Sequence, residues 1–314
     1  MTWMVTGGAG YIGAHVVQAF LDEGMDVVVV DDLSSGHEEF VPADTPFVRT
    51  SILDVVALRT AMREHADTGV VHLAGDKYAG VSVQRPLHTY EQNVTGTARL
   101  LEAMQAADVD AVVFSSSAAV YGTPDTDLVT EATATAPESP YGESKLIGEW
   151  LLRDQATATA ETDRPLRHTS LRYFNVVGSG RADLYDSSPH NLFPLVIDAL
   201  LAGRTPRING TDYATPDGTC VRDYIHVADL ARSHVAAART LAAGGTLEPV
   251  YNLGSGDGVS VREIMTTMAE VTGIPFVPEE APRRPGDPAR IVASGDLAAD
   301  LDADRAGSGD DTGL

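Results

Sequence analysis

Short runs of β-branched and other apolar residues alternate with longer helical stretches through the first half of the chain. Such alternation is typical of βαβ units and therefore of a parallel sheet. The runs that predict strands are residues 4–6, 27–30, 47–50, 70–73, 111–115 and 168–174. Apolar residues occupy both faces of the runs at 27–30 and 70–73, as expected where helices cover both sides of a sheet. The pattern predicts an α/β fold with a doubly wound parallel sheet of the Rossmann type.

Helical periodicity marks the segments between these strands and two segments farther along the chain. The predicted helices are residues 11–23, 55–65, 86–107, 141–159, 227–241 and 260–272. From about residue 178 the chain becomes irregular and rich in Gly, Pro, Asp and Thr, which predicts a smaller C-terminal lobe. We therefore expect one domain at 1–177, with contributions from 225–252, and a lobe at 178–314. Residues 298–314 lack an apolar period and predict a loose acidic tail.

The composition is that of an ordinary folded protein and limits its partners. Of the 314 residues, 43% are hydrophobic and 21% are charged, values typical of globular domains. The formal net charge of −23 argues against nucleic-acid binding, which needs a basic surface. Cys220 is the only cysteine, which excludes an internal disulfide and leads us to expect a reducing, cytoplasmic compartment. The sequence has no signal-peptide pattern and no apolar run of about 20 residues, so we expect no membrane partner.

A glycine-rich turn joins the first predicted strand to the first predicted helix. Gly7, Gly10 and Gly13 follow the strand and open the helix, the context that a dinucleotide fingerprint requires. Glycines there permit a tight turn and let a pyrophosphate approach the free N–H groups of the helix. Asp31 follows the second strand, where a carboxylate can accept hydrogen bonds from ribose hydroxyls and would repel a 2′-phosphate. No arginine follows at 32–36, so the sequence predicts NAD rather than NADP.

Two further motifs indicate hydride-transfer chemistry. Tyr141 and Lys145 lie four residues apart on a predicted helix, so both side chains project from one face. A neighbouring ammonium favours the phenolate, and Tyr141 can then act as a general base. Ser117 closes a serine run at a strand end, where ligands bind in open α/β sheets, and could pass a proton to Tyr141. Together the three residues predict a catalytic site beside the dinucleotide.

With these motifs the chain resembles the extended short-chain dehydrogenase/reductases, and within them the UDP-glucose 4-epimerase family. The resemblance covers residues 1 to about 294. The matching segments are 7–13, 115–122, 141–145, 171–175, 217–227 and 251–254. Related dehydratases usually carry Asp or Glu near the catalytic region, where this chain has Ser and Ala. The match therefore favours an epimerase.

The resemblance implies a reaction in two halves at C4 of a UDP-sugar. Tyr141 would take the proton of the 4-hydroxyl through or alongside Ser117 while NAD accepts the C4 hydride. Hydride would then return to the opposite face of the resulting 4-keto sugar. Lys145 would hydrogen-bond the nicotinamide ribose and hold the Tyr141 pKa down. NAD would be regenerated in each cycle and remain bound.

The resemblance also assigns binding residues by position. For NAD it implies Gly7, Gly10, Tyr11, Ile12, Gly13, Asp31, Asp32, Ser51, Ile52, Leu73, Ala74, Gly75, Lys77, Asn93, Tyr141, Lys145 and Phe174. For the UDP-sugar it implies Lys77, Ser117, Tyr141, Asn175, Asn191, Leu192, Asn209, Arg222, Tyr224, Arg284 and Asp287. Arg222 and Arg284 would hold the diphosphate through charge-assisted hydrogen bonds, despite the acidic surface. No metal site is predicted.

Several positions depart from the pattern of the family. Ser51 stands where the family usually has an Asp that contacts adenine, and Asn209 where an aromatic ring usually packs on the uracil. Ile291 often has a larger counterpart in the family, which implies a roomier pocket that would accept N-acetylated sugars. Residues 298–314 match neither the apolar, tryptophan-containing segment nor the final helix with which family members usually end.

Alternatives to a UDP-galactose/UDP-glucose 4-epimerase therefore stay open at this point. The nearest is a 4-epimerase for UDP-N-acetylglucosamine, or for UDP-xylose and UDP-arabinose. A non-catalytic, NAD-sensing module is a second alternative, since Rossmann folds are also used that way, but Ser117, Tyr141 and Lys145 argue against it. The resemblance also implies a homodimer in which helices 86–107 and 141–159 pair across a two-fold axis.

Overall fold

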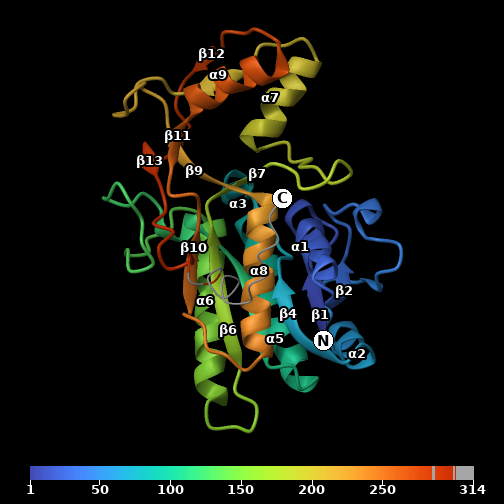
Figure 1. The fold of residues 1–314 in the computed structure, drawn as a ribbon. Helices are drawn as coiled ribbons and strands as arrows, with labels where there is room; N and C mark the ends of the chain where they lie inside the picture. The colour runs from blue at the N-terminus through green and yellow to red at the C-terminus, as the bar shows by residue number, and fades with distance from the viewer. Residues whose placement is uncertain (285–286, 300, 302–314) are drawn as a thin grey trace, which may run out of the picture.

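The computed structural model describes residues 1–284, 287–299 and 301, and a seven-stranded parallel sheet lies at its centre (Figure 1). The strands run in the order β10-β6-β5-β4-β1-β2-β3. Their bounds are β1 (Thr2–Thr6), β2 (Asp26–Asp31), β3 (Phe47–Arg49), β4 (Asp67–His72), β5 (Ala111–Ser117), β6 (Arg167–Tyr173) and β10 (Val250–Leu253). All of them except β10 confirm strands predicted from the sequence, with ends that differ by a few residues. The doubly wound α/β fold is confirmed.

Helices cover both faces of this sheet. On one face lie α1 (Tyr11–Asp22) and α8 (Val227–Ala242), which pack against each other. On the other face lie α2 (Val55–Glu64), α5 (Gly96–Ala106) and α6 (Pro140–Thr159). Figure 1 shows α8 and α6 on either side of β6.

Strand β1 shows how side chains divide between the two layers. Trp3 and Val5 pack with Phe20 of α1, whereas Met4 between them packs with Leu58 of α2. The division follows from the strand geometry, because successive side chains point to opposite faces. All five side chains are fully buried, and burial of each contributes about 1.5 to 3 kcal/mol. Both faces of the sheet are therefore core.

The helix predicted at 86–107 is present but interrupted. A π-helical turn, η2 (Glu91–Thr95), separates α4 (Pro86–Tyr90) from α5. Within this turn Asn93 accepts a hydrogen bond from the Asp76 N–H at 2.7 Å and donates one to the Asp76 carbonyl at 3.0 Å. The widened turn thus seats the Asn93 amide on the loop after β4. Helical periodicity does not predict such an interruption, which is frequent at functional sites.

The second lobe, at the top of Figure 1, consists of short elements that follow β6. Its helices are α7 (Leu192–Leu201) and α9 (Val261–Thr272). In one small sheet β9 (Val221–His226) pairs with β7 (Asn175–Val177), β11 (Gly258–Ser260) and β13 (Arg290–Ile291), and in another β8 (Arg207–Asn209) pairs with β12 (Glu279–Ala281). The remaining short helices of the described chain are η1 (Glu38–Phe40), α3 (Ala79–Gln84) and η3 (Ala118–Tyr121).

Helix α9 begins and ends where the sequence predicts. Ser260 accepts a hydrogen bond from the Glu263 N–H, and the Glu263 carboxylate accepts one from the Ser260 N–H. This capping box satisfies two free N–H groups of the first turn. At the other end Gly273 adopts a φ of +67°, a left-handed conformation that glycine adopts without strain.

The division of the chain into two domains at residue 177 stays a prediction.

The tail predicted at 298–314 lies mostly outside the described residues. Leu301 is buried in the core beside α1 and α8, and Leu297 and Ala298 pack against the same cluster. The prediction of a loose segment is therefore wrong for residues 298 and 301. Their apolar side chains fill the edge of the core, where burial outweighs the low local hydrophobicity.

Candidate active site

The glycine-rich turn between β1 and α1 leaves no room for side chains. Gly7 has a φ of +72°, and a Cβ atom there would lie 2.7 Å from the Ala74 nitrogen. A Cβ atom on Gly13 would lie 2.0 Å from the Gly7 carbonyl oxygen. Gly10 is the N-cap of α1 and supplies no side chain to cap the first N–H groups of the helix. The turn therefore fits a pyrophosphate, which needs close backbone approach and free N–H donors.

Replacing Gly13 by alanine is expected to weaken NAD binding about 5- to 150-fold, because the clash must move backbone at a cost of about 1 to 3 kcal/mol. The added methyl would push Gly7 away from the helix N-terminus. Calorimetric titration of cofactor-stripped protein with NAD measures the loss. Gly80→Ala is the matched control, since a Cβ atom there meets nothing within 4 Å. Equal NAD affinity in the two variants would contradict the assignment of the turn.

Asp31 lies at the end of β2 with a partly engaged carboxylate. Its oxygens accept hydrogen bonds from the Leu33 N–H at 2.8 Å and the Ala9 N–H at 3.1 Å. Burial raises the pKa of Asp31, and these two bonds and the charge of Lys77 oppose that rise. A carboxylate accepts about four hydrogen bonds, so acceptor positions remain for ribose hydroxyls. The exposed Asp32 next to it accepts from the Ser34 N–H at 2.8 Å.

The other positions predicted to bind NAD fall into two groups. Ile12, Ile52 and Leu73 are wholly or partly buried, and the Ile52 side chain packs against Gly96. The rest lie in loops or short helical turns around the sheet edge, as follows. The Ser51 hydroxyl accepts a hydrogen bond from the Leu53 N–H, and the Ala74 N–H donates one to the Thr6 hydroxyl. Gly75 has a φ of +140° and lies beside the Asn93 side chain. Lys77 is exposed, whereas Phe174, directly after β6, is buried.

Tyr141, Lys145 and Ser117 lie together at the carboxyl end of β5. Pro140 opens α6 and Ser139 caps it by accepting the Gly142 N–H at 3.2 Å, so the helix begins just before Tyr141. The Tyr141 phenol is hydrogen-bonded to Ser117. Lys145 donates to the Ser115 carbonyl at 2.8 Å, and its Nζ lies 5.9 Å from the centre of the Tyr141 ring. The structure thus brings together the residues that the sequence pairs.

Burial shifts the pKa values of the two titratable groups in opposite directions. Burial raises the pKa of Tyr141, and the hydrogen bond with Ser117 lowers it. Burial also lowers the pKa of Lys145 to about 8, because a charged amine loses solvation there. The contribution of the Lys145 ammonium to the Tyr141 pKa stays a prediction. Ser117 is the partner that favours the phenolate in this structure.

A buried ion pair that the sequence does not indicate joins strand β6 to helix α6. Arg172 of β6 and Glu149 of α6 make two hydrogen bonds, Nε to Oε1 at 2.9 Å and Nη2 to Oε2 at 2.6 Å. Ser116 donates to the same carboxylate, and the Arg172 Nη1 donates to the Tyr121 hydroxyl at 2.7 Å. Tyr121 in turn donates to Asn252 of β10 at 2.7 Å. This network joins α6 to the strands β5, β6 and β10 of the sheet.

The positions predicted to bind a UDP-sugar lie mainly on the second lobe. Asn175 is the first residue of β7 and is separated from the end of β6 by Phe174 alone. It pairs with Tyr224 of β9 and is hydrogen-bonded to that tyrosine. Arg222 on the same strand forms an ion pair with Asp287, Nη2 to Oδ1 at 3.5 Å. The pairing of β7 with β9 therefore connects the carboxyl end of β6 to the strand of the second lobe that carries Arg222.

The remaining positions form three further contacts of the lobe. With its amide oxygen turned toward Arg284, Asn209 accepts hydrogen bonds from Nε at 3.1 Å and Nη2 at 2.9 Å. Asn191 is the N-cap residue of α7 and donates to the Asp186 carboxylate at 2.7 Å. Leu192 packs with the apolar residues of the lobe. Asn209, which stands where the family usually has an aromatic ring, therefore contacts Arg284 in this structure.

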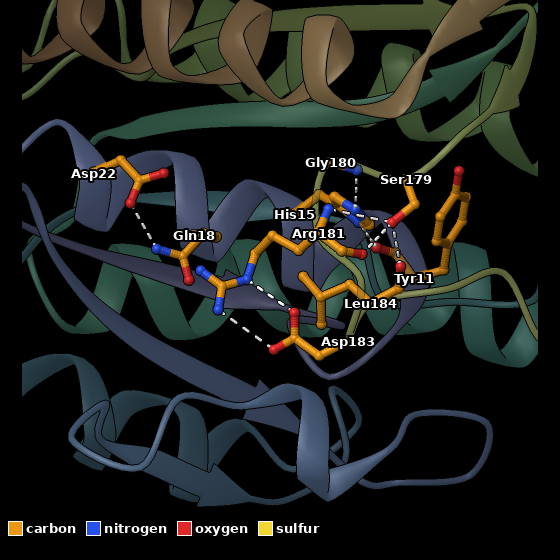
Figure 2. A network of polar contacts seen from close by, with 9 residues as sticks. All are labelled: Tyr11, His15, Gln18, Asp22, Ser179, Gly180, Arg181, Asp183 and Leu184. Atoms are coloured by element: carbon orange, nitrogen blue, oxygen red, sulfur yellow. Dashed lines mark hydrogen bonds and ion pairs between the residues drawn. The ribbon is translucent and has the colours of Figure 1, made fainter.

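The segment after β7 is tied to the N-terminal end of α1, a feature that sequence patterns miss (Figure 2). Tyr11 donates to the Gly178 carbonyl at 2.6 Å, and the Gly180 N–H donates to the His15 Nε2 at 3.1 Å. Farther along, Leu184 packs with Phe40 in a small buried cluster. The segment therefore crosses from the second lobe to the glycine-rich turn. The hydroxyl of Tyr11, a residue predicted to bind NAD, is therefore already hydrogen-bonded to this segment.

The fold and the site define a dinucleotide-dependent Rossmann enzyme with a Ser, Tyr and Lys centre. The family model described as "NAD dependent epimerase/dehydratase family" matches residues 3–254, and the chain belongs to this family. The cofactor of the family is NAD, in agreement with the prediction from Asp31. Among the described residues, no helix is long and apolar enough to cross a membrane.

The chain is also similar to individual proteins that are named as 4-epimerases. The UDP-glucose 4-epimerase of Azospirillum brasilense is 46% identical over 93% of this chain and 84% of its own length. The structure of UDP-glucose 4-epimerase from Brucella ovis in complex with NAD has a TM-score of 0.90 and 39% identity, covering 96% of this chain and 91% of that one. The UDP-Glc/GlcNAc 4-epimerase from Campylobacter jejuni has a TM-score of 0.81 and 34% identity, covering 96% and 92%.

Proposed function

We propose that this protein is an NAD-dependent isomerase that interconverts UDP-galactose and UDP-glucose by inverting C4 of the sugar. The observation that carries the proposal is the hydrogen-bonded Ser117 and Tyr141 pair, with Lys145 beside it, at the sheet edge that also carries the glycine-rich turn. The 4-epimerases among the relatives support the same reaction.

Each residue has a definite task in this proposal. NAD, when bound, supplies a hydride acceptor and donor at the sheet edge. Gly7, Gly10 and Gly13 bring backbone N–H groups to its pyrophosphate, and Asp31 orients its ribose. Tyr141 takes and returns the proton of the sugar 4-hydroxyl through Ser117, to which it is hydrogen-bonded. The other positions assigned to NAD by resemblance belong to the same proposal.

Binding of the nucleotide part falls to the second lobe. Arg222 and Arg284 are the cations that would hold the diphosphate, since guanidinium groups match its oxygens with two hydrogen bonds at once. Asn175 and Tyr224 would position the sugar, because their contact joins the lobe to the end of β6. The other positions assigned to the UDP-sugar by resemblance are proposed on the same basis.

The experiment that tests the activity is an assay of the purified protein with four UDP-sugars. We expect turnover of UDP-galactose to UDP-glucose, read by separation of the two nucleotides after reaction. UDP-N-acetylglucosamine, UDP-xylose and UDP-arabinose complete the panel. Absence of UDP-galactose turnover would reject the proposal, and faster turnover of another member would replace its substrate.

A 4-epimerase that also accepts UDP-N-acetylglucosamine is the second candidate. The relative from Campylobacter jejuni is a UDP-Glc/GlcNAc 4-epimerase. Ile291 favours this candidate, because an isoleucine stands where the family often has a larger residue and packs beside Phe174 and Ala293. The same four-sugar assay decides between the two.

We also propose that this enzyme works in a reducing, cytoplasmic compartment, because its one cysteine is buried and unpaired.

We further propose that the enzyme is a homodimer. Leu87 of α4 is 82% exposed, Val83 of α3 is 62% exposed and Trp150 of α6 is 46% exposed. Helices α3, α4 and α6 contact one another, and we propose that two copies of the chain meet at their exposed apolar side chains. Exposed apolar patches of this kind mark interaction sites.

The Leu87→Asp variant is expected to convert the dimer into a monomer, because a buried, unpaired carboxylate in the interface is costly. Light scattering coupled to size exclusion measures the change in mass. Val277→Asp is the matched control, since Val277 is 85% exposed and lies on the second lobe, away from α4 and α6. A wild-type protein that is monomeric at micromolar concentration would contradict the proposed assembly.

A further inference from the structure

A buried chain of hydrogen bonds begins at His234 on α8. Its ring is fully buried, and Nδ1 lies 2.8 Å from the Leu230 carbonyl oxygen. A carbonyl oxygen only accepts, so Nδ1 carries the ring hydrogen. Burial lowers the pKa of His234 to about 4, and the ring is therefore neutral near pH 7. Its Nε2 is left as a bare acceptor.

The hydrogen-bond chain continues through the sheet to the catalytic lysine. The Tyr173 hydroxyl, at the end of β6, is hydrogen-bonded to His234 Nε2 and must donate to it. The Ser115 side-chain hydroxyl donates a hydrogen bond to the Tyr173 hydroxyl, and the backbone carbonyl of the same serine accepts one from Lys145 Nζ at 2.8 Å. In the strand register Tyr173 lies opposite Ser117. The chain thus links α8 on one face of the sheet to α6 on the other.

Packing alone does not account for a phenol and an imidazole at these positions. An apolar pair would fill the same space without the cost of burying polar groups. Burial raises the pKa of Tyr173, a hydrogen bond from Ser115 lowers it, and the negative charge of an ionised Tyr141 raises it further. Tyr173 therefore keeps its proton when Tyr141 ionises.

We propose that His234 and Tyr173 are positioning residues for the proton transfer at Tyr141, an inference that rests on the proposed function. His234 accepts the Tyr173 proton and so fixes the direction of that hydroxyl. Tyr173 in turn holds Ser115 in the conformation whose carbonyl keeps the Lys145 ammonium near the Tyr141 ring. A second phenol beside the general base stays neutral and does not compete with it for ionisation.

The test uses the NAD-loaded enzyme with Tyr173→Phe and, separately, His234→Leu. We expect kcat to fall about tenfold in each variant while KM stays nearly unchanged. The reason is that a small displacement of a catalytic group can lower the rate by up to about 10²-fold. The apparent pKa assigned to Tyr141 in the kcat–pH profile should rise, since the nearby ammonium is less firmly held. His234→Gln should restore most of the rate, because its side-chain oxygen can accept the Tyr173 proton.

Thr169→Val is the matched control for a merely structural effect. Thr169 lies on the same strand and the same face as Tyr173, is fully buried, and donates to the Glu248 carbonyl at 2.9 Å. This variant should lose stability but keep the wild-type pH profile. A Tyr173→Phe variant with the wild-type profile, or a His234→Gln variant no better than His234→Leu, would overturn the positioning role.

A second measurement separates this inference from the proposed function. Carbon-13 NMR of labelled tyrosine follows ionisation of Tyr141 in the NAD-loaded protein without turnover, and the resonance missing in Tyr141→Phe identifies it. A higher pKa in Tyr173→Phe supports the positioning role even if UDP-galactose is not converted. An unchanged pKa in an active enzyme overturns the positioning role and leaves the proposed function intact.

Discussion

Replacing Tyr141 by phenylalanine is expected to lower kcat for UDP-galactose by about 10²- to 10⁴-fold, the contribution of a positioned general acid–base. The substitution removes the phenol oxygen that is hydrogen-bonded to Ser117 and leaves the aromatic ring near Lys145. KM should change little, and the protein should keep its NAD, because the glycine-rich turn and Asp31 are untouched. Steady-state kinetics and quantification of released cofactor measure both.

Tyr251→Phe is the control for this substitution. The Tyr251 hydroxyl accepts a hydrogen bond from the Glu248 N–H at 3.0 Å and lies on β10, outside the proposed site. Its removal should leave kcat within about a factor of two, as expected of a residue that does not touch the reacting atoms. If Tyr141→Phe retained activity at the level of this control, Tyr141 would not be the base.

Replacing Glu149 by glutamine is expected to destabilise the fold by about 3 to 5 kcal/mol, since it leaves a buried charge on Arg172 without a counterion. Both side chains are less than a tenth exposed. Burial lowers the pKa of Arg172, but the hydrogen bonds and charge of Glu149 outweigh this and raise it, so the guanidinium stays charged. Chemical denaturation followed by circular dichroism measures the free energy of unfolding.

The double variant Glu149→Leu, Arg172→Met tests whether the loss of stability comes from the unpaired charge on Arg172. Removing both charges leaves no unpaired ion, and apolar replacements of buried ion pairs are often neutral. Most of the stability lost in Glu149→Gln should therefore return. A Glu149→Gln variant within about 1 kcal/mol of the wild type would mean that water or another group compensates the Arg172 charge.

The parts of the site that sequence reasoning located depend on local spacing. Gly7, Gly10 and Gly13 act within one turn, and Tyr141 and Lys145 project from one turn of helix. Strand β10 is missed because it has only four residues and its place is set by pairing with β6, about 80 residues earlier in the chain. Local patterns predict local geometry, and the sheet edge then brings these pieces together.

The features that could not be predicted arise from contacts between distant segments. Tyr11 and Gly178 are 167 residues apart, and Glu149 and Arg172 come from different elements with no shared motif. The π-helical turn at Asn93 depends on the loop that carries Asp76. In each case the determining interaction exists only once the tertiary fold has formed. Sequence periodicity contains no signal for it.

The most direct test of the proposed reaction is the fate of deuterium placed at C4 of UDP-galactose. The purified protein is incubated with this substrate in ordinary water, and the UDP-glucose formed is analysed by mass spectrometry and NMR. The proposal predicts that deuterium stays at C4, because the hydrogen removed there is returned within the same site. Loss of the deuterium to water would contradict it.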